Sequence, residues 1–127
     1  MRHLLLSLFF VISAMTAQAQ DARLSSLDTG DAARGWEAVG RLDIAGRGFC
    51  TGALIAPDLV LTAAHCTYDA RTGASVTARD LTFRAGFRDG RAQAERVVLQ
   101  IARPSAYRYA GDDHALNIRS DVALLRL

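Results

Sequence analysis

Three residues in the middle of the chain could do chemistry together: Cys50, His65 and Cys66. An imidazole changes its protonation near neutral pH, so a histidine held in place can act as a general base or acid. Two cysteines can form a disulfide, or they can bind zinc together with a histidine. The zinc alternative lacks a clear fourth ligand and a C-x-x-C pair, and the adjacent pair His65-Cys66 would strain a tetrahedral site. The choice between these alternatives depends on where the chain is located.

The first 19 residues have the three parts of a secretory signal peptide. A basic start, Met1-Arg2-His3, precedes an apolar run from Leu4 to Ala14, and Ala17-Gln18-Ala19 forms an A-x-A cleavage site. The apolar run is too short to span a bilayer. We therefore expect a secreted protein, extracellular or periplasmic, with no membrane association after the signal is cleaved.

Export favours a disulfide between the two cysteines of this chain, Cys50 and Cys66. Such a bridge closes a loop of about 15 residues, which is worth about 3 kcal/mol in the chain-entropy model. The bridge would also hold the backbone beside His65.

The residues around this histidine have the pattern of a β-hairpin. Two short apolar runs, Ala53–Ile55 and Leu59–Leu61, are separated by Ala56-Pro57-Asp58, which is typical of a tight turn. Small residues and then His65 follow the second run, so the imidazole lies at the end of a strand.

Further strands are predicted along the rest of the chain. Residues 40–44 alternate, and Leu81, Phe83, Ala85 and Phe87 share one face of another strand. Asp89-Gly90 predicts a hairpin whose returning strand turns Val97, Leu99 and Ile101 inward, and residues 121–127 form a last apolar strand. Six strands without a long helix predict an all-β barrel or sandwich. The interior is expected to contain Leu54, Leu81, Phe83, Val97, Leu99 and Leu124.

Composition and charge limit the organisation and the partners. Residues 20–35 are polar and small, which is typical of a flexible leader or short propeptide, and residues 36–127 are long enough for one domain. The formal net charge is +2, and all fifteen basic residues are arginines scattered along the chain. Without a basic cluster, we expect no nucleic-acid partner.

The hairpin and its histidine resemble a known family. The run Leu61-Thr62-Ala63-Ala64-His65-Cys66, with Cys50-Thr51-Gly52-Ala53-Leu54-Ile55 before it, is similar to the chymotrypsin/trypsin superfamily of serine peptidases. In that family a strand ending in T-A-A-H-C carries the catalytic histidine. The phrase G-F-C-T-G-A-L-I is most similar to the bacterial secreted branch, which includes V8-like glutamyl peptidases. Asp121-Val122-Ala123-Leu124-Leu125 resembles the family's second signature, D-I-A-L-L.

The resemblance implies a fold and a reaction. The fold is an antiparallel six-stranded Greek-key barrel, the N-terminal half of a chymotrypsin-like double barrel. The activity is hydrolysis of protein or peptide substrates without a cofactor, in which His65 takes the nucleophile's proton and Asp121 fixes the imidazole tautomer. On the residues alone, Asp121 could also end the polar loop in an exposed position. Asp112 and Asp113 are weaker candidates because no strand holds them, and His114 is expected to be solvated.

The chain departs from the family pattern at two segments. Trypsin-like zymogens carry an R-I-V-G-G activation site, and the nearest segment here is Arg34-Gly35-Trp36, a poor match. The run from Arg103 to Tyr107 resembles the family's H-P-x-Y segment, with Arg103 in place of the histidine.

Nothing in the sequence resembles G-D-S-G-G, the segment of the family's nucleophile. The serines outside the signal peptide lack flanking glycines: Ser25, Ser26, Ser75, Ser105 and Ser120. We therefore expect a fragment or truncated form, inactive alone, whose second barrel (C-terminal half) is missing along with the specificity pocket. The alternatives are a non-catalytic secreted β-barrel binding module or pseudoprotease, and an unrelated disulfide-stabilised β-domain that mimics both motifs.

Overall fold

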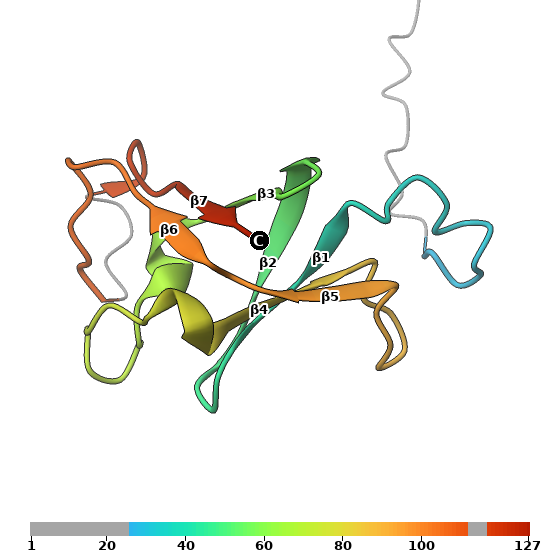
Figure 1. Ribbon diagram of the computed structural model, residues 1–127, viewed down its shortest axis with the longest axis horizontal. Coiled ribbons are helices and arrows are strands. Elements are labelled where there is room, and N and C mark those ends of the chain that lie inside the picture. The colour runs from blue at the N-terminus through green and yellow to red at the C-terminus, as the bar shows by residue number, and fades with distance from the viewer. Residues whose placement is uncertain (1–25, 112–116) are drawn as a thin grey trace, which may run out of the picture.

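The computed structural model describes residues 26–111 and 117–127 as strands, turns and two short 3-10 helices (Figure 1). The expected signal peptide (1–19), the start of the expected leader, Ser25, and the rival candidates Asp112, Asp113 and His114 lie outside these described residues. Within the described ranges, no helix is long and apolar enough to cross a membrane.

The described residues form seven strands in one antiparallel sheet. The strands are β1 (Val39–Ile44), β2 (Gly48–Ala56), β3 (Leu59–Thr62), β4 (Leu81–Ala85), β5 (Ala94–Val97), β6 (Gln100–Ala102) and β7 (Ala123–Arg126). Their order across the sheet is β5-β4-β1-β2-β3-β7-β6. The 3-10 helices are η1 (Ala64–Thr67), directly after β3, and η2 (Ala78–Asp80), directly before β4. The prediction of an all-β antiparallel fold is therefore confirmed.

Both predicted hairpins are present. Strands β2 and β3 pair on either side of Pro57-Asp58, with Ala56 opposite Leu59. After β4, Arg88 and Arg91 bond to each other's backbone across Asp89-Gly90. Asp89 has φ 49° and Gly90 has φ 78°, the left-handed pair that a two-residue type I′ turn requires. Short-range turn chemistry was thus sufficient to place both turns.

The sheet curls until its two edges meet at one connection. Strands β5 and β6 lie at opposite edges in the pairing order, yet only Val98 and Leu99 separate them in the chain. The Val98 N–H donates to Leu81 O on β4 at 2.9 Å, and the Leu99 N–H donates to Arg126 O on β7 at 2.7 Å. Figure 1 shows β5 and β6 as one nearly continuous ribbon. The connection therefore passes from one edge of the sheet to the other.

The inner face of this curled sheet contains the main hydrophobic core. Its largest fully buried apolar side chains come from five segments of the chain: Leu42, Val60, Leu81, Phe83, Val98 and Leu125. Leu54 is partly buried and packs against this cluster. The prediction was thus right for Leu81 and Phe83.

The sheet of the described residues has seven strands, whereas six were expected. Three predicted core residues also face outward. Val97, Leu99 and Leu124 are 45%, 61% and 36% exposed. The prediction treated the segment after the Asp89-Gly90 turn as one continuous strand, but it bends at Val98, which is fully buried. β7 contains two adjacent leucines, and alternation alone does not determine which of them faces inward. Leu125, rather than the predicted Leu124, occupies the inward position.

Candidate active site

The pairing of β3 with β7 brings His65 and Asp121 together. Thr62, the last residue of β3, lies opposite Ala123, the first residue of β7. Because the strands are antiparallel, the chain leaving β3 and the chain entering β7 are at the same end of the ladder. His65 follows Thr62 by three residues and Asp121 precedes Ala123 by two. The two side chains therefore meet although 56 positions separate them.

Both carboxylate oxygens of Asp121 bind the same histidine. Oδ2 lies 2.7 Å from Nδ1 of the His65 ring. Oδ1 accepts the backbone N–H of His65 at 2.9 Å. The side chain of Asp121 is 15% exposed and that of His65 is 36% exposed, so the pair lies at the rim of the fold. One aspartate thus fixes both the ring and the backbone of the histidine.

These contacts keep Asp121 ionised. Burial by itself raises the pKa of Asp121, but the hydrogen bonds from the His65 side chain and backbone, together with the charge of His65, outweigh it. The net pKa of Asp121 lies below its ordinary value. An ionised carboxylate only accepts hydrogen bonds, so Nδ1 of His65 must be the donor. In the neutral imidazole the unprotonated, basic nitrogen is then Nε2.

The disulfide fixes the other side of the histidine. Cys66 in η1 is bonded to Cys50 in β2, and their Cα atoms are 6.0 Å apart. The sulfur atoms of Cys50 and Cys66 and the ring of His65 lie within 4.8 Å of one another, the grouping considered above for zinc. Because the two sulfurs are bonded to each other, they offer no thiolates to a metal. The structure therefore supports the disulfide rather than the zinc alternative.

Comparison with known proteins agrees with this arrangement. The family model described as trypsin matches residues 29–127. The chain belongs to the trypsin family. A search of curated proteins finds no match to it.

Two solved structures share the fold of this trypsin-family chain. A Glu endopeptidase, solved in complex with MPD, is 22% identical with a TM-score of 0.56, and the match covers 82% of this chain and 43% of that one. A scabies mite inactivated protease paralogue, S-D1, is 15% identical with a TM-score of 0.52, over 71% of this chain and 33% of that one. The trypsin-family chain thus spans less than half the length of either structure.

A second buried cluster supports the histidine turn of this trypsin-family chain. Ala64, Tyr107 and Ala123 are buried together, and Tyr68 and Tyr109 pack against them. Tyr68 stacks on Tyr109 with ring centroids 4.9 Å apart. Burial, and then the charge of Asp121, raise the pKa of Tyr107, so its hydroxyl stays protonated at neutral pH. The site therefore rests on an aromatic layer at the end of the β3–β7 ladder.

Arg103, expected from the resemblance to stand in place of the histidine of the family's H-P-x-Y segment, joins this layer to η1. Its Nη2 donates to Thr67 O at 3.2 Å and to Ser75 Oγ at 2.8 Å. Its guanidinium lies 4.8 Å from the centroid of the Tyr68 ring. Thr67 is fully buried and donates its hydroxyl to Ala64 O at 2.6 Å. Sequence reasoning noticed the substitution but missed these contacts, because no local pattern relates Arg103 to Thr67.

Three of the four described serines make side-chain hydrogen bonds elsewhere, and the fourth, Ser105, is exposed. Ser26 Oγ contacts Asp28, Ser75 Oγ bonds to Arg103 and Val76 O, and Ser120 Oγ donates to Asn117 O. Beside His65 lies a cleft of about 220 Å³. Its other lining residues include the disulfide, Phe49, Tyr68 and Tyr109. The histidine therefore borders a hollow that a reacting group could enter.

Proposed function

We propose that this chain carries the histidine–aspartate part of a secreted serine endopeptidase, with His65 as general base and Asp121 as its orienting carboxylate. The observation that carries the proposal is the double contact of Asp121 with His65, at 2.7 Å to Nδ1 and 2.9 Å to the backbone nitrogen. Membership of the trypsin family and the signal-peptide pattern of residues 1–19 support it.

The geometry supports a specific division of roles. Asp121 holds Nδ1 as the donor, so Nε2 is the nitrogen that can take a proton from a nucleophile. When His65 becomes an imidazolium, the ionised Asp121 stabilises the new charge at 2.7 Å. His65 then returns the proton to the leaving amine of the peptide. The substrates are proteins or peptides, and no step requires a cofactor.

The nucleophile and the oxyanion donors are proposed to lie on a second barrel. In support, the chain spans only 43% and 33% of the two solved structures that share its fold. We propose that the described sheet is the first barrel of such a pair, with the Greek-key arrangement of the family. Residues 1–127 alone are then expected not to hydrolyse peptides, because proton transfer needs a nucleophile.

The test compares two forms of the protein on casein, with a serine-directed covalent inhibitor. One form is the 127-residue chain, and the other is a chain extended through a G-D-S-G-G segment. The extended form should be active and inhibitor-sensitive, and His65→Ala should reduce its turnover about 10⁴-fold or more, as in related triads.

Asp89→Asn, a substitution at an exposed turn away from His65, is the control and should leave turnover unchanged. Inhibitor-sensitive turnover by the 127-residue chain would reveal a nucleophile within it. An extended chain that is indifferent to His65→Ala would refute the proposed base.

A further inference from the structure

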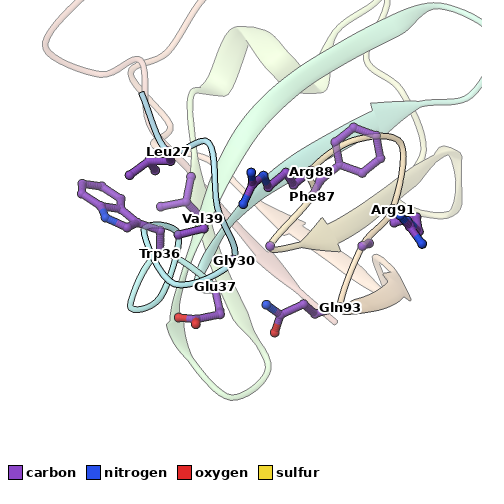
Figure 2. A pocket seen from close by; sticks show the side chains of 12 residues that line it. Leu27, Gly30, Trp36, Glu37, Val39, Phe87, Arg88, Arg91 and Gln93 are labelled. Atoms are coloured by element: carbon purple, nitrogen blue, oxygen red, sulfur yellow. The ribbon is translucent and has the colours of Figure 1, made fainter. Parts of the chain in front are cut away.

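A second hollow lies away from the histidine, between the residues that precede β1 and the turn that follows β4. Its volume is about 460 Å³, within the range of small-ligand and side-chain pockets. Figure 2 shows Leu27, Trp36 and Val39 on one wall, with Arg88 reaching toward them from the other. Phe87 and Gln93 complete the second wall. The catalytic roles proposed above use none of these residues.

The apolar wall of this pocket is unusually open to solvent. Trp36 is 58% exposed, Leu27 is 40% exposed and Val39 is 38% exposed. Large apolar side chains gathered in one concave site are typical of binding surfaces, and tryptophan and arginine are enriched among the residues that contribute most to binding. The wall therefore favours a ligand with an apolar side chain.

The charge of the pocket indicates which chemical group accompanies the apolar side chain of the ligand. Arg88 pairs with Asp89 through Nε at 3.3 Å, and its terminal nitrogens make no hydrogen bond with the described residues. Arg91 makes no ion pair within the same ranges. The one acidic residue in the lining, Glu37, already accepts the N–H of Gly35 at 2.7 Å. A carboxylate is the group that matches the planar terminal donors of an arginine.

The pocket also continues toward the histidine. Val39 and Phe87 line a neighbouring hollow of about 400 Å³ that includes Arg41 and Phe49. Phe49 in turn lines the cleft beside His65. The guanidinium of Arg41 lies 4.1 Å from the centroid of the Phe49 ring, so an aromatic and cationic surface connects the two ends. An extended chain, rather than a compact molecule, fits such a series of adjoining hollows.

We propose that this pocket binds an extended peptide segment in which an apolar side chain lies next to an acidic residue. The apolar side chain packs against Trp36, Leu27 and Val39, and the carboxylate binds the terminal nitrogens of Arg88. This binding does not require catalysis, so it goes beyond the function proposed for His65 and Asp121.

Trp36 is the only tryptophan of the chain, so its fluorescence reports binding in the pocket directly. We would titrate a blocked peptide, Gly-Glu-Leu-Glu-Gly, into the His65→Ala chain, and compare it with the same peptide carrying Lys in place of both Glu. A saturable fluorescence change is expected for the acidic peptide, with binding at least about tenfold weaker for the lysine peptide. Because His65→Ala removes the proposed base, a failure of the catalytic proposal leaves this result unaffected.

Charge reversal at the pocket gives the matched variants. Arg88→Glu should weaken binding of the acidic peptide at least about tenfold. Arg79→Glu makes the same change at an exposed residue of η2 outside the pocket lining and should have no effect. Circular dichroism checks folding, and Arg88→Gln replaces Arg88→Glu if the latter is unfolded.

Equal affinity for the two peptides, or undiminished binding by a folded Arg88 variant, would overturn the proposal. Decanoate tests a lipid-like anion with the same chemistry. Saturable binding of decanoate without binding of the acidic peptide would also overturn the assignment of a peptide.

Discussion

At the scale of single residues, Asp121 links the position of His65 to its protonation. One oxygen holds the ring at Nδ1 and the other holds the backbone N–H, so the side chain cannot rotate without breaking a charge-assisted hydrogen bond. The same contacts lower the pKa of Asp121. Orientation of the imidazole and ionisation of its partner therefore have one physical origin.

We expect Asp121→Asn to lower the free energy of unfolding by about 1.5–3 kcal/mol at pH 7, the usual value of hydrogen bonds to a charged group. Because folding lowers the pKa of Asp121, its contribution is fully present above the pKa of the unfolded chain, near 4. That contribution is lost as pH falls through the folded pKa. Urea unfolding followed by circular dichroism from pH 2.5 to 7 measures this change.

The variant should therefore differ from the wild type most at neutral pH and least in acid. Asp89→Asn is the matched control, because it removes the same charge from an exposed turn in which asparagine is equally suitable. A difference between wild type and Asp121→Asn that stays constant down to pH 2.5 would contradict the linkage.

The residues of the candidate site could be singled out from sequence only where the signal was contiguous. His65 and Cys66 lie in one six-residue run, and Asp121 begins another. The contact of Asp121 with the backbone of His65 and the bonds of Arg103 to Thr67 depend on how distant segments meet. Such contacts have no period or motif, so the sequence carried no signal for them.

At the scale of elements, the bend at Val98 determines which side chains enter the core. Val98 is fully buried and bonds to β4, whereas the next residue, Leu99, is 61% exposed and bonds to β7. Alternation along a strand predicts burial only while the strand remains straight. Turn chemistry and the inward face of β4 were therefore predictable, but the bend and the outward Val97 and Leu99 were not.

Truncation on either side of this bend tests its geometry. We expect Val98→Ala to lower the free energy of unfolding by about 1–3 kcal/mol, through lost burial and a residual cavity. Leu99→Ala, which removes a larger side chain from an exposed position, should change it by less than about 0.5 kcal/mol. Thermal unfolding shows which of the two variants is less stable. A larger loss of stability for Leu99→Ala than for Val98→Ala would contradict the bend and support one straight strand.

A glycine sets how closely β1 approaches β4. A Cβ added at Gly40 would lie 2.3 Å from Arg84 O and 2.7 Å from the ring of Phe83. We expect Gly40→Ala to destabilise the fold by about 1–3 kcal/mol or more, the range of overpacked cores.

Gly30→Ala is the control, because an added Cβ there meets nothing within 4 Å. Denaturant midpoints measure both variants. Equal midpoints for Gly40→Ala and Gly30→Ala would mean that the two strands are further apart than described.

At the scale of the whole molecule, one curled sheet presents the histidine at its rim rather than in its interior. The core lies inside the curl, while η1, the disulfide and the start of β7 meet at the end of the β3–β7 ladder. A partly exposed histidine beside a cleft is suited to the proposed nucleophile that approaches from a neighbouring domain. This arrangement agrees with the proposed function, which assigns the serine to a second barrel.

The tautomer of His65 tests this account most directly, because the proposed base must be Nε2. Long-range ¹H–¹⁵N correlation spectra of the 127-residue chain distinguish the protonated from the unprotonated ring nitrogen, and a His65→Gln variant assigns the signals among the three histidines. At a pH where the ring is neutral, we predict a proton on Nδ1 in the wild type and loss of that preference in Asp121→Asn. A wild-type His65 protonated on Nε2, or one unchanged by Asp121→Asn, would contradict the account.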